Sequence, residues 1–489
     1  MPSLSAPGGR RARQQFTYRA YVPDPINGAA LAFTAATATD IAEAEAAIAV
    51  ANHGQHLVAM ETMARLLLRS ESVASSRIEG LECSQRRLAE AAFAPEHAGE
   101  TARQVLANID AMRTATELGA ADRALTVDDV LAMHRLLMRE DRMTARFAGA
   151  LRTEQNWIGG RNDSPRDAAY VPPPPGNVEP LMRDLLAFVN RDDVPVLAQA
   201  AIAHAQFETI HPFVDGNGRV GRCLIHTVLA RRRLASRILV PVSLVLAAYG
   251  GQYIQGLVDF REGRFDEWCG TFASAAKLAV DGAARFEEQL ATMIARWRQE
   301  SDARPGSHLW RACERIVIAP VFTVASLRAD LDSSVTAATE AVERLVGIGV
   351  VSQVSLGRRN RVYLNRAVLR LLDDFERDLL TGPDGQPGRL RRSAPARTSI
   401  PPAVLPSVEH AVLETFPVGT DRPSTSQTIA QLAGYPVEQV RDVLARLAGE
   451  GLLAGTATEG LLAGTATEGW MLTGKGRRLR EMLRTGDVS

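Results

Sequence analysis

The chain has 489 residues, 46% of them hydrophobic, and its 56 basic and 56 acidic side chains leave no formal net charge. This length predicts roughly three or four domains with apolar cores. The balanced charge excludes a general electrostatic attraction to nucleic acid or to a membrane, so either partner would need a local basic patch.

Targeting and redox signals favour the cytoplasm. The N-terminal arm is rich in Pro, Gly and Arg and lacks the apolar run of a signal peptide. No stretch approaches the ~18 consecutive apolar residues of a membrane-spanning helix, so we expect no membrane partner. Reduced core cysteines are more consistent with the scattered spacing than a disulfide or zinc framework. The cysteines are Cys83, Cys223, Cys269 and Cys313.

Helical periodicity dominates as far as residue 300. The expected helices lie at 40–80, 100–118, 127–139, 178–190, 194–210 and 219–235. Between the third and fourth of these, residues 157–172 have two short β-prone ends around a polar tip at 161–166. This pattern predicts a hairpin, which we call the flap.

After residue 309 the pattern changes to helix, turn, helix and hairpin, which is typical of a winged helix. The expected elements are helices at 323–331 and 336–348 and strands at 350–356 and 361–364. A linker rich in Pro, Gly and Arg follows, and then a weaker copy of the same pattern. In this copy the helices lie at 425–433 and 437–449 and the hairpin near 451–473.

We therefore expect a mainly α fold, in which a helical core with a short hairpin flap precedes two small winged-helix domains of the α+β type. The expected parts are an N-terminal helical region (1–115), a catalytic core (116–300), a winged-helix domain (301–380), a linker (381–406) and a second winged-helix-like domain (407–489).

The most informative segment is 211–222, His-Pro-Phe-Val-Asp-Gly-Asn-Gly-Arg-Val-Gly-Arg, which connects two predicted helices. The backbone N–H groups from Gly216 to Gly218, at a helix N-terminus, make a site for anionic oxygen. Arg219 and Arg222 lie about one helical turn apart, so both guanidinium groups can reach the same polyphosphate. Phosphate binding is therefore the first function that this segment predicts.

The same segment offers a metal ligand and a base. Asp215 is a hard oxygen ligand of the kind that Mg²⁺ takes together with phosphate and water. His211, with an ordinary pKa of about 6.5, can accept the proton of an attacking Ser, Thr or Tyr hydroxyl. In-line attack on the α-phosphate of ATP would release pyrophosphate, with positioning and charge neutralisation supplying most of the rate.

This segment resembles the active-site loop of Fic-domain proteins, and every position that defines the family motif is filled. Members of that family typically transfer AMP from ATP onto a hydroxyl side chain of another protein. The resemblance covers residues 15–285 and implies a Fic helical core, ATP as substrate and Mg²⁺. It implies His211 as base, Asp215 as metal ligand, and Gly216, Asn217, Gly218, Arg219 and Arg222 as nucleotide-binding residues.

The resemblance extends to the flap, which is similar to the family's target-binding hairpin and would align a substrate backbone by strand addition. The positions concerned are Ile158, Gly159, Tyr170 and Val171. The alternative is a solvated hairpin without a partner. Tyr253 resembles a tyrosine that the family places near the adenine, and a packing role is an equal alternative. For His204 we expect a packed side chain rather than a second base.

Residues 75–80, Ser-Ser-Arg-Ile-Glu-Gly, fit the family's inhibitory pattern Ser/Thr-x-x-x-Glu-Gly/Asn, with Ser75 at its first position. Gly80 suits a helix C-cap, which would fix Glu79 in the last turn. The resemblance implies that Glu79 pairs with Arg222 and occupies the place of the γ-phosphate. A solvated glutamate at a helix end is the alternative.

The winged-helix interpretation suggests DNA binding, although residues 333–345 contain Arg344 as their single cation and phosphate contacts need Lys and Arg. The predicted wing is more basic, with Arg358, Arg359 and Arg361. DNA binding and a protein-docking or dimerising role both stay open.

The sequence thus predicts an autoinhibited protein adenylyltransferase, a nucleotidyltransferase acting on a Ser, Thr or Tyr hydroxyl of an unknown target protein or of itself. One alternative keeps the site but changes the reaction to removal of AMP or transfer of another phosphate-containing group. Another alternative is an ATP-sensing, DNA-binding transcription regulator. A homo-oligomer is compatible with the sequence.

Overall fold

The computed structural model describes residues 17–381 except 55–57, 142, 161–163 and 356–360, and beyond them residues 390, 424–425, 444, 453–458 and 467–472. The chain divides into two compact units, Met1–Ala396 and Arg397–Ser489, and each is described by itself.

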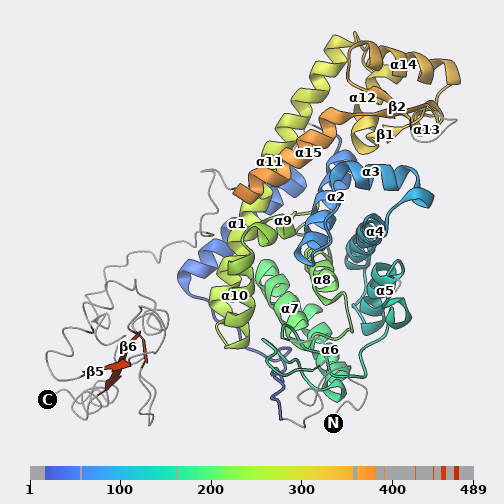
Figure 1. The fold of residues 1–489 in the computed structure, drawn as a ribbon. Helices are drawn as coiled ribbons and strands as arrows, with labels where there is room; N and C mark the ends of the chain where they lie inside the picture. Colours follow the sequence, from blue (N-terminus) through green and yellow to red (C-terminus); the bar gives the residue numbers. More distant parts are fainter. Residues whose placement is uncertain are drawn as a thin grey trace. The chain divides into compact units, whose positions relative to one another are not determined.

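Helices build most of the first unit (Figure 1). They are α1 (Ala35–His53), α2 (Met60–Ile78), α3 (Gln85–Phe93), η1 (Pro95–His97), α4 (Glu100–Ala120), α5 (Val127–Met138), η2 (Ala145–Phe147), α6 (Pro175–Val189), α7 (Val196–Ile210), α8 (Asn217–Arg231), α9 (Val242–Ala248), α10 (Gly250–Arg261) and α11 (Phe265–Glu300). The helical stretch expected over 40–80 is therefore two helices, α1 and α2, while the other expected helices are present with shifted ends.

The pair α7 and α8 forms the centre of this unit. Every residue of α7 from Leu197 to Ile210, and every residue of α8 from Asn217 to Ala230, is buried. A helix that is buried around its whole circumference must be enclosed by other elements. Helices α4, α10 and α11 pack against the pair (Figure 1). The connection between α7 and α8 is thus held between two helices that other helices enclose.

Side-chain caps fix the starts of several helices. At α5 the Thr126 hydroxyl accepts the backbone N–H of Asp129, whose carboxylate accepts the N–H of Thr126 in return. At α1 the Thr34 hydroxyl accepts the N–H of Thr37. Such caps satisfy N–H groups that have no partner inside the helix, and they explain why these helices begin at Thr.

A small module with a three-stranded sheet follows α11. Its elements are α12 (His308–Ile318), β1 (Val321–Phe322), α13 (Val324–Leu331), α14 (Val335–Gly347), β2 (Ser352–Ser355) and β3 (Arg361–Leu364). The sheet is antiparallel in the order β1-β3-β2. The expected succession of two helices and two strands is confirmed. Strand β1 was not predicted, because two residues carry no periodicity.

Helix α15 (Arg366–Thr381) leaves the module and returns to the helical body, where it packs against α3, α9 and α11 (Figure 1). Its buried apolar side chains include Val368, Leu372 and Phe375. The Phe375 ring lies 4.6 Å from that of Phe286 on α11. The sequence analysis did not predict this helix.

In the second unit, strands β4 (Ser424–Thr425), β5 (Leu453–Thr458) and β6 (Thr467–Leu472) form an antiparallel sheet in the order β4-β6-β5. Strands β5 and β6 pair from Leu453↔Leu472 to Thr458↔Thr467, where a hairpin was expected. The linker at 381–406 and the helices expected at 425–433 and 437–449 fall almost entirely outside the described residues.

In the described part of the chain, no helix combines the length and the apolar character that crossing a membrane requires.

Candidate active site

The site loop, residues 211–216, joins the end of α7 to the start of α8, and both of its ends have a left-handed backbone. His211 is the C-cap of α7 with φ 49°, and Gly216 is the N-cap of α8 with φ 77°. A Cβ at Gly216 would lie 2.8 Å from the sulfur of Met138. Only glycine satisfies both the backbone conformation and this close approach. The sequence therefore closes a tight turn at the N-terminus of α8.

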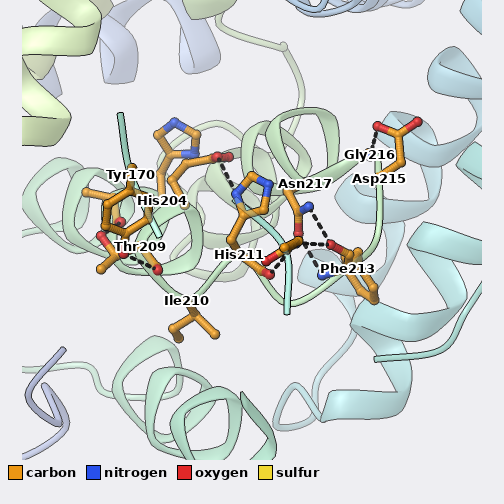
Figure 2. A network of polar contacts seen from close by, with 12 residues as sticks. Tyr170, His204, Thr209, Ile210, His211, Phe213, Asp215, Gly216 and Asn217 are labelled. Carbon is orange, nitrogen blue, oxygen red and sulfur yellow. Dashed lines mark hydrogen bonds and ion pairs between the residues drawn. The ribbon is translucent and has the colours of Figure 1, made fainter. Parts of the chain in front are cut away.

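The Asn217 side chain holds the loop rather than pointing to solvent. Its Oδ1 accepts the N–H of Phe213 at 2.8 Å, and its Nδ2 donates to the carbonyl of Phe213 at 2.9 Å (Figure 2). Phe213 itself is fully buried, as a core residue should be. Asn217 therefore serves the loop with its side chain, while its backbone N–H belongs to the first turn of α8.

His134 on α5 supports the loop from the other side, with its ring stacked on Phe213 at 3.7 Å between centroids. The N–H of Gly149 donates to its Nδ1 at 2.9 Å, so the proton of the neutral ring is on Nε2. This Nε2 lies 3.1 Å from the Asp215 carbonyl and donates to it. Burial lowers the pKa of His134 to about 4, which keeps the ring neutral.

His211 presents a neutral imidazole at the mouth of the site. Its side chain is 18% exposed. Burial, together with the charge of Arg152, lowers the pKa of His211 to about 4. A ring with this pKa is a neutral imidazole at neutral pH, so one of its two nitrogens has a free lone pair that can accept a proton.

The carboxyl of Glu208 lies beside this ring, with its Oε2 4.0 Å from His211 Nδ1. Burial raises the pKa of Glu208 to about 8, against the opposing charge of Arg222. Both groups are therefore neutral near pH 7, so the contact is not an ion pair.

Two buried arginines follow at the N-terminus of α8. Arg219 is 4% exposed and Arg222 is 1% exposed. Their charges and the first N–H groups of α8 converge where Glu79 reaches in from α2. A Cβ at Gly218 would collide with the Glu79 carboxylate, so this carboxylate lies directly against the first turn of α8. An anionic group thus already occupies the position that favours negative charge.

The pair expected between Glu79 and Arg222 is present. Arg222 Nη2 donates to Glu79 Oε1 at 2.8 Å, and the guanidinium also donates to the Ser75 hydroxyl at 2.9 Å and to its carbonyl at 2.7 Å. Burial works against the charge of Glu79, but Arg222 outweighs it and lowers the pKa of this carboxyl. All three polar contacts bind the end of α2 to α8.

The end of α2 has the geometry that the sequence predicted. Gly80 has φ 78°, its N–H donates to the Arg77 carbonyl at 2.9 Å, and the N–H of Leu81 donates to the Ser76 carbonyl at 3.0 Å. These two bonds define a Schellman motif, which ends the helix at a fixed residue. Glu79 is consequently fixed at the C-cap, one residue before the turn.

Asp215 is exposed, and its Oδ1 accepts the N–H of Gly216 at 2.6 Å. Among the described residues, no group of three or more His, Cys, Asp and Glu side chains could hold a metal ion. A single carboxylate next to an anion site nevertheless fits Mg²⁺, which takes its other ligands from phosphate and water.

In the described part of the flap, Ile158 and Tyr170 form an antiparallel bridge and exchange backbone hydrogen bonds of 2.8 and 3.1 Å. Ile158 and Gly159 are exposed. Tyr170 turns inward and donates its hydroxyl to the Thr209 carbonyl at 2.6 Å (Figure 2). The Val171 carbonyl accepts the N–H of Tyr21 at 2.9 Å. Val171 is thus already paired with Tyr21, whereas Ile158 and Gly159 face solvent.

Tyr253 and His204 lie behind the arginines. Tyr253 is 4% exposed and its hydroxyl lies 2.9 Å from His204 Nε2. His204 is fully buried, and burial lowers its pKa to about 3. The expectation that His204 is a packed side chain is confirmed. In the structure, Tyr253 packs against His204.

Sequence reasoning missed four residues that shape this site: His134, Arg152, Asn156 and Glu208. Asn156 Nδ2 donates to the Phe213 carbonyl at 2.9 Å, and Arg152 donates to the carbonyl of His211 at 2.9 Å. Of these four, Glu208 could have been found from the sequence, because it lies three residues before His211 and residues three apart on a helix share a face. The others come from distant segments, and no local pattern marks them.

The fold and the loop define a mainly helical protein with a neutral histidine beside an arginine-lined anion site. Residues 124–229 match the family model described as Fic/DOC family, and residues 38–117 match the model described as Fic/DOC family N-terminal. These two matches identify a segment similar to the Fic/DOC family within residues 38–229 of the chain.

Curated relatives match over limited lengths. The protein adenylyltransferase Fic of Drosophila erecta is 34% identical over 110 residues, 22% of this chain and 20% of the relative. The protein adenylyltransferase fic-1 of Caenorhabditis elegans is 29% identical over 141 residues, 28% of this chain and 25% of the relative. A probable protein adenylyltransferase of Aquifex aeolicus is 30% identical over 183 residues, 36% of this chain and 52% of the relative. The chain thus spans about half or less of these relatives.

Solved structures of Fic proteins are similar at lower identity. A Fic family protein from Desulfovibrio desulfuricans G20 gives a TM-score of 0.44 at 21% identity, covering 68% of this chain and 97% of that one. Fic-1 from Caenorhabditis elegans gives a TM-score of 0.42 at 19% identity, covering 52% of this chain and 73% of that one.

Proposed function

We propose that the protein is an autoinhibited protein adenylyltransferase, which transfers AMP from ATP to a Ser, Thr or Tyr hydroxyl of a target protein or of itself. The observation that carries this proposal is the neutral imidazole of His211 at one end of a loop whose other end begins α8, with Arg219 and Arg222 on that helix. Homology to protein adenylyltransferases supports the same reaction class.

In this proposal the triphosphate binds at the N-terminus of α8. The backbone N–H groups of Gly216, Asn217 and Gly218 meet phosphate oxygens, and Arg219 and Arg222 neutralise the β- and γ-phosphates. Asp215 would hold Mg²⁺, which supplies charge neutralisation on the phosphates when bound.

His211 then acts as the base. It takes the proton of the target hydroxyl as that oxygen forms a bond to the α-phosphorus, and the bond to the bridging oxygen breaks so that pyrophosphate leaves. The products are the AMP ester of the target, pyrophosphate and the proton on His211, which later passes to solvent. The burial of α7 and α8, which flank the ring and the proposed anion site, supports a mechanism based on positioning.

Glu79 is the proposed brake. Its carboxylate takes the Arg222 contact and the space against Gly218 that the γ-phosphate needs. A charge-assisted hydrogen bond contributes about 1.5–3 kcal/mol. With 34% of the Glu79 side chain exposed, solvent screening places this pair toward the lower end. Competition of this size lowers productive ATP binding by about tenfold.

We further propose that the flap binds the target by strand addition at its exposed Ile158–Gly159 side. The target is a protein, and the site of action is the cytoplasm.

For the C-terminal modules we propose winged-helix folds. DNA is a candidate partner of the first one through its wing. The single cation of α14, Arg344, already donates to the Ser301 carbonyl at 3.0 Å, which favours protein docking for that helix. A shift in DNA mobility caused by the full chain would support DNA.

Transfer of label from α-labelled ATP tests the proposed function. Glu79→Gly should incorporate label into itself or into lysate proteins well above wild type, and His211→Ala should remove incorporation in either background. Mass spectrometry should show a gain of one AMP on the modified peptide. A gain of another group, or release of AMP from a modified protein, would replace this reaction with a related one. Label incorporation that persists in His211→Ala would refute the base.

A further inference from the structure

Arg152 is a buried cation whose guanidinium, among the residues that the structure describes, donates to backbone carbonyls. It is 3% exposed. Its Nε donates to the carbonyl of His211 at 2.9 Å, its Nη2 to that of Pro173 at 2.5 Å, and its Nη1 to that of Glu154 at 3.1 Å. Burying a charge without a carboxylate partner is costly, so a structure keeps it only where its geometry is needed.

These acceptors lie on both sides of the flap and in the site loop. Glu154 precedes the flap, Pro173 follows it, and His211 begins the loop. The backbone N–H of Arg152 adds a bond to the Pro212 carbonyl at 2.9 Å. One residue therefore ties the two ends of the flap to the loop.

His211 needs such support because it is not glycine and has a left-handed backbone with φ 49°. This conformation is unfavourable for an L-residue other than glycine. A donor that binds the His211 carbonyl from a fixed position offsets this cost and fixes the direction of the side chain.

We propose that Arg152 is the positioning residue of this site, holding His211 in its left-handed conformation and setting the flap at a fixed distance from it. This inference rests on the proposed adenylyl transfer. It predicts that replacing the Arg152 guanidinium misaligns the target hydroxyl and His211, while ATP binding at α8 is retained.

The test uses the full chain with Glu79→Gly as parent, comparing Arg152→Lys and Arg152→Gln. Both variants should lower kcat by about 10²-fold, as small misplacements do, with the KM for ATP within about threefold of the parent. A rise in the KM for ATP at unchanged kcat would overturn the proposal.

The pH profile separates positioning from general damage to the fold. The charged or titratable groups that face His211 are Arg152, Glu79 and Glu208. Removing the Arg152 charge should move the acid limb of the profile to higher pH in Arg152→Gln, while Arg152→Lys, which keeps a charge, should leave it in place. If the acid limb of the pH profile does not move in Arg152→Gln, the contribution of the Arg152 charge to the titration of His211 is overturned. Should Arg152→Gln unfold, Arg152→Lys decides by its kcat and KM. A parent without transfer would instead refute the proposed function.

A different contact carries a second inference, about the brake. Arg77, in the last turn of α2, lies 2.5 Å from Glu376 of α15. Glu376 also accepts a hydrogen bond from Gln85 Nε2, and its side chain is 5% exposed. Arg69 Nε in turn donates to Gln85 Oε1 at 2.6 Å. A buried network thus joins α15, which follows the three-stranded module directly, to the helix that ends in Glu79.

The geometry points to α15 as a clasp that keeps the brake engaged. Because the Gly80 N–H binds the Arg77 carbonyl, a shift of Arg77 displaces the turn that fixes Glu79. Binding of a protein partner to the module would then release the brake by moving α15, with α15 and α2 as the coupled elements.

Glu376→Gln and Arg77→Gln test this clasp in the full chain. In the wild-type background each should raise label incorporation about fivefold or more, the lower range of measured allosteric couplings. In the Glu79→Gly background neither should raise it further. Equal activity of wild type and both variants, while Glu79→Gly is activated, overturns the clasp. An inactive Glu79→Gly would instead refute the brake.

Discussion

The Glu79 carboxylate lies 2.8 Å from Arg222 Nη2 and directly against Gly218, so one anionic side chain covers both the cation and the helix N-terminus that a phosphate would use. The contact joins the end of α2 to the first turns of α8 across 143 residues of sequence. Whether Glu79 or a nucleotide phosphate occupies this position therefore depends on the charges that meet there.

Replacing Glu79 with Gln should separate charge from volume. Glutamine keeps the size of the side chain but removes the charge that competes with phosphate. We expect about tenfold more label incorporation than wild type, below the level of Glu79→Gly. Initial rates with α-labelled ATP measure this. Activity equal to wild type would mean that Glu79 blocks the site by its volume alone.

Replacing Gly218 with Ala should oppose activation. The new Cβ would meet the Glu79 carboxylate, and in the Glu79→Gly background it would project into the space of the γ-phosphate. We expect Gly218→Ala to raise the KM for ATP in that background by about tenfold. Gly176→Ala, which has open space at its Cβ, is the matched control. An unchanged KM would place the phosphates elsewhere.

The sequence predicted the site loop well because its residues are contiguous. His211 and Asp215 lie in one turn between two helices, and Arg219 and Arg222 follow in the first turns of α8, so their order along the chain accounts for their proximity. The Glu79–Arg222 pair spans distant elements, and it was found only because residues 75–80 resemble a known pattern.

The supporting residues had no such signal. Arg152 looks like any surface arginine in sequence, and its burial follows from the way the flap ends pack on the loop. His134 lies on a regular amphipathic helix, where a core role and a loop contact give the same pattern. Strand β1 and helix α15 were missed for different reasons: β1 is too short to show periodicity, and α15 was not singled out despite its apolar face.

The activity should persist far into the acid range. Burial and Arg152 lower the pKa of His211 to about 4, while the Glu79 charge raises it, so removing Glu79 lowers it further. In Glu79→Gly the base therefore stays neutral at pH 5, and incorporation should fall only near or below about pH 4. Initial rates between pH 4 and 8, with circular dichroism to monitor the fold, measure this. A midpoint near the ordinary histidine value of about 6.5 would contradict the buried ring.

Glu208 should make the fold less stable as the pH rises. Burial raises its pKa from 4.5 to about 8, so the folded state holds a proton that the unfolded chain loses. Folding therefore binds a proton within this window, and the free energy of unfolding falls as the pH rises from about 4.5 to 8.

Glutamine at this position stays neutral and keeps the shape of the protonated acid. The Tm of Glu208→Gln relative to wild type should therefore increase from pH 5 to pH 9, whatever its value at pH 5. Thermal unfolding of both chains across this range measures the difference, with Glu179→Gln on α6 as the matched control, since the Glu179 side chain is 58% exposed. If the two Tm curves stayed parallel, Glu208 would be ionised in the folded protein, and the burial of a neutral carboxyl beside His211 would be wrong.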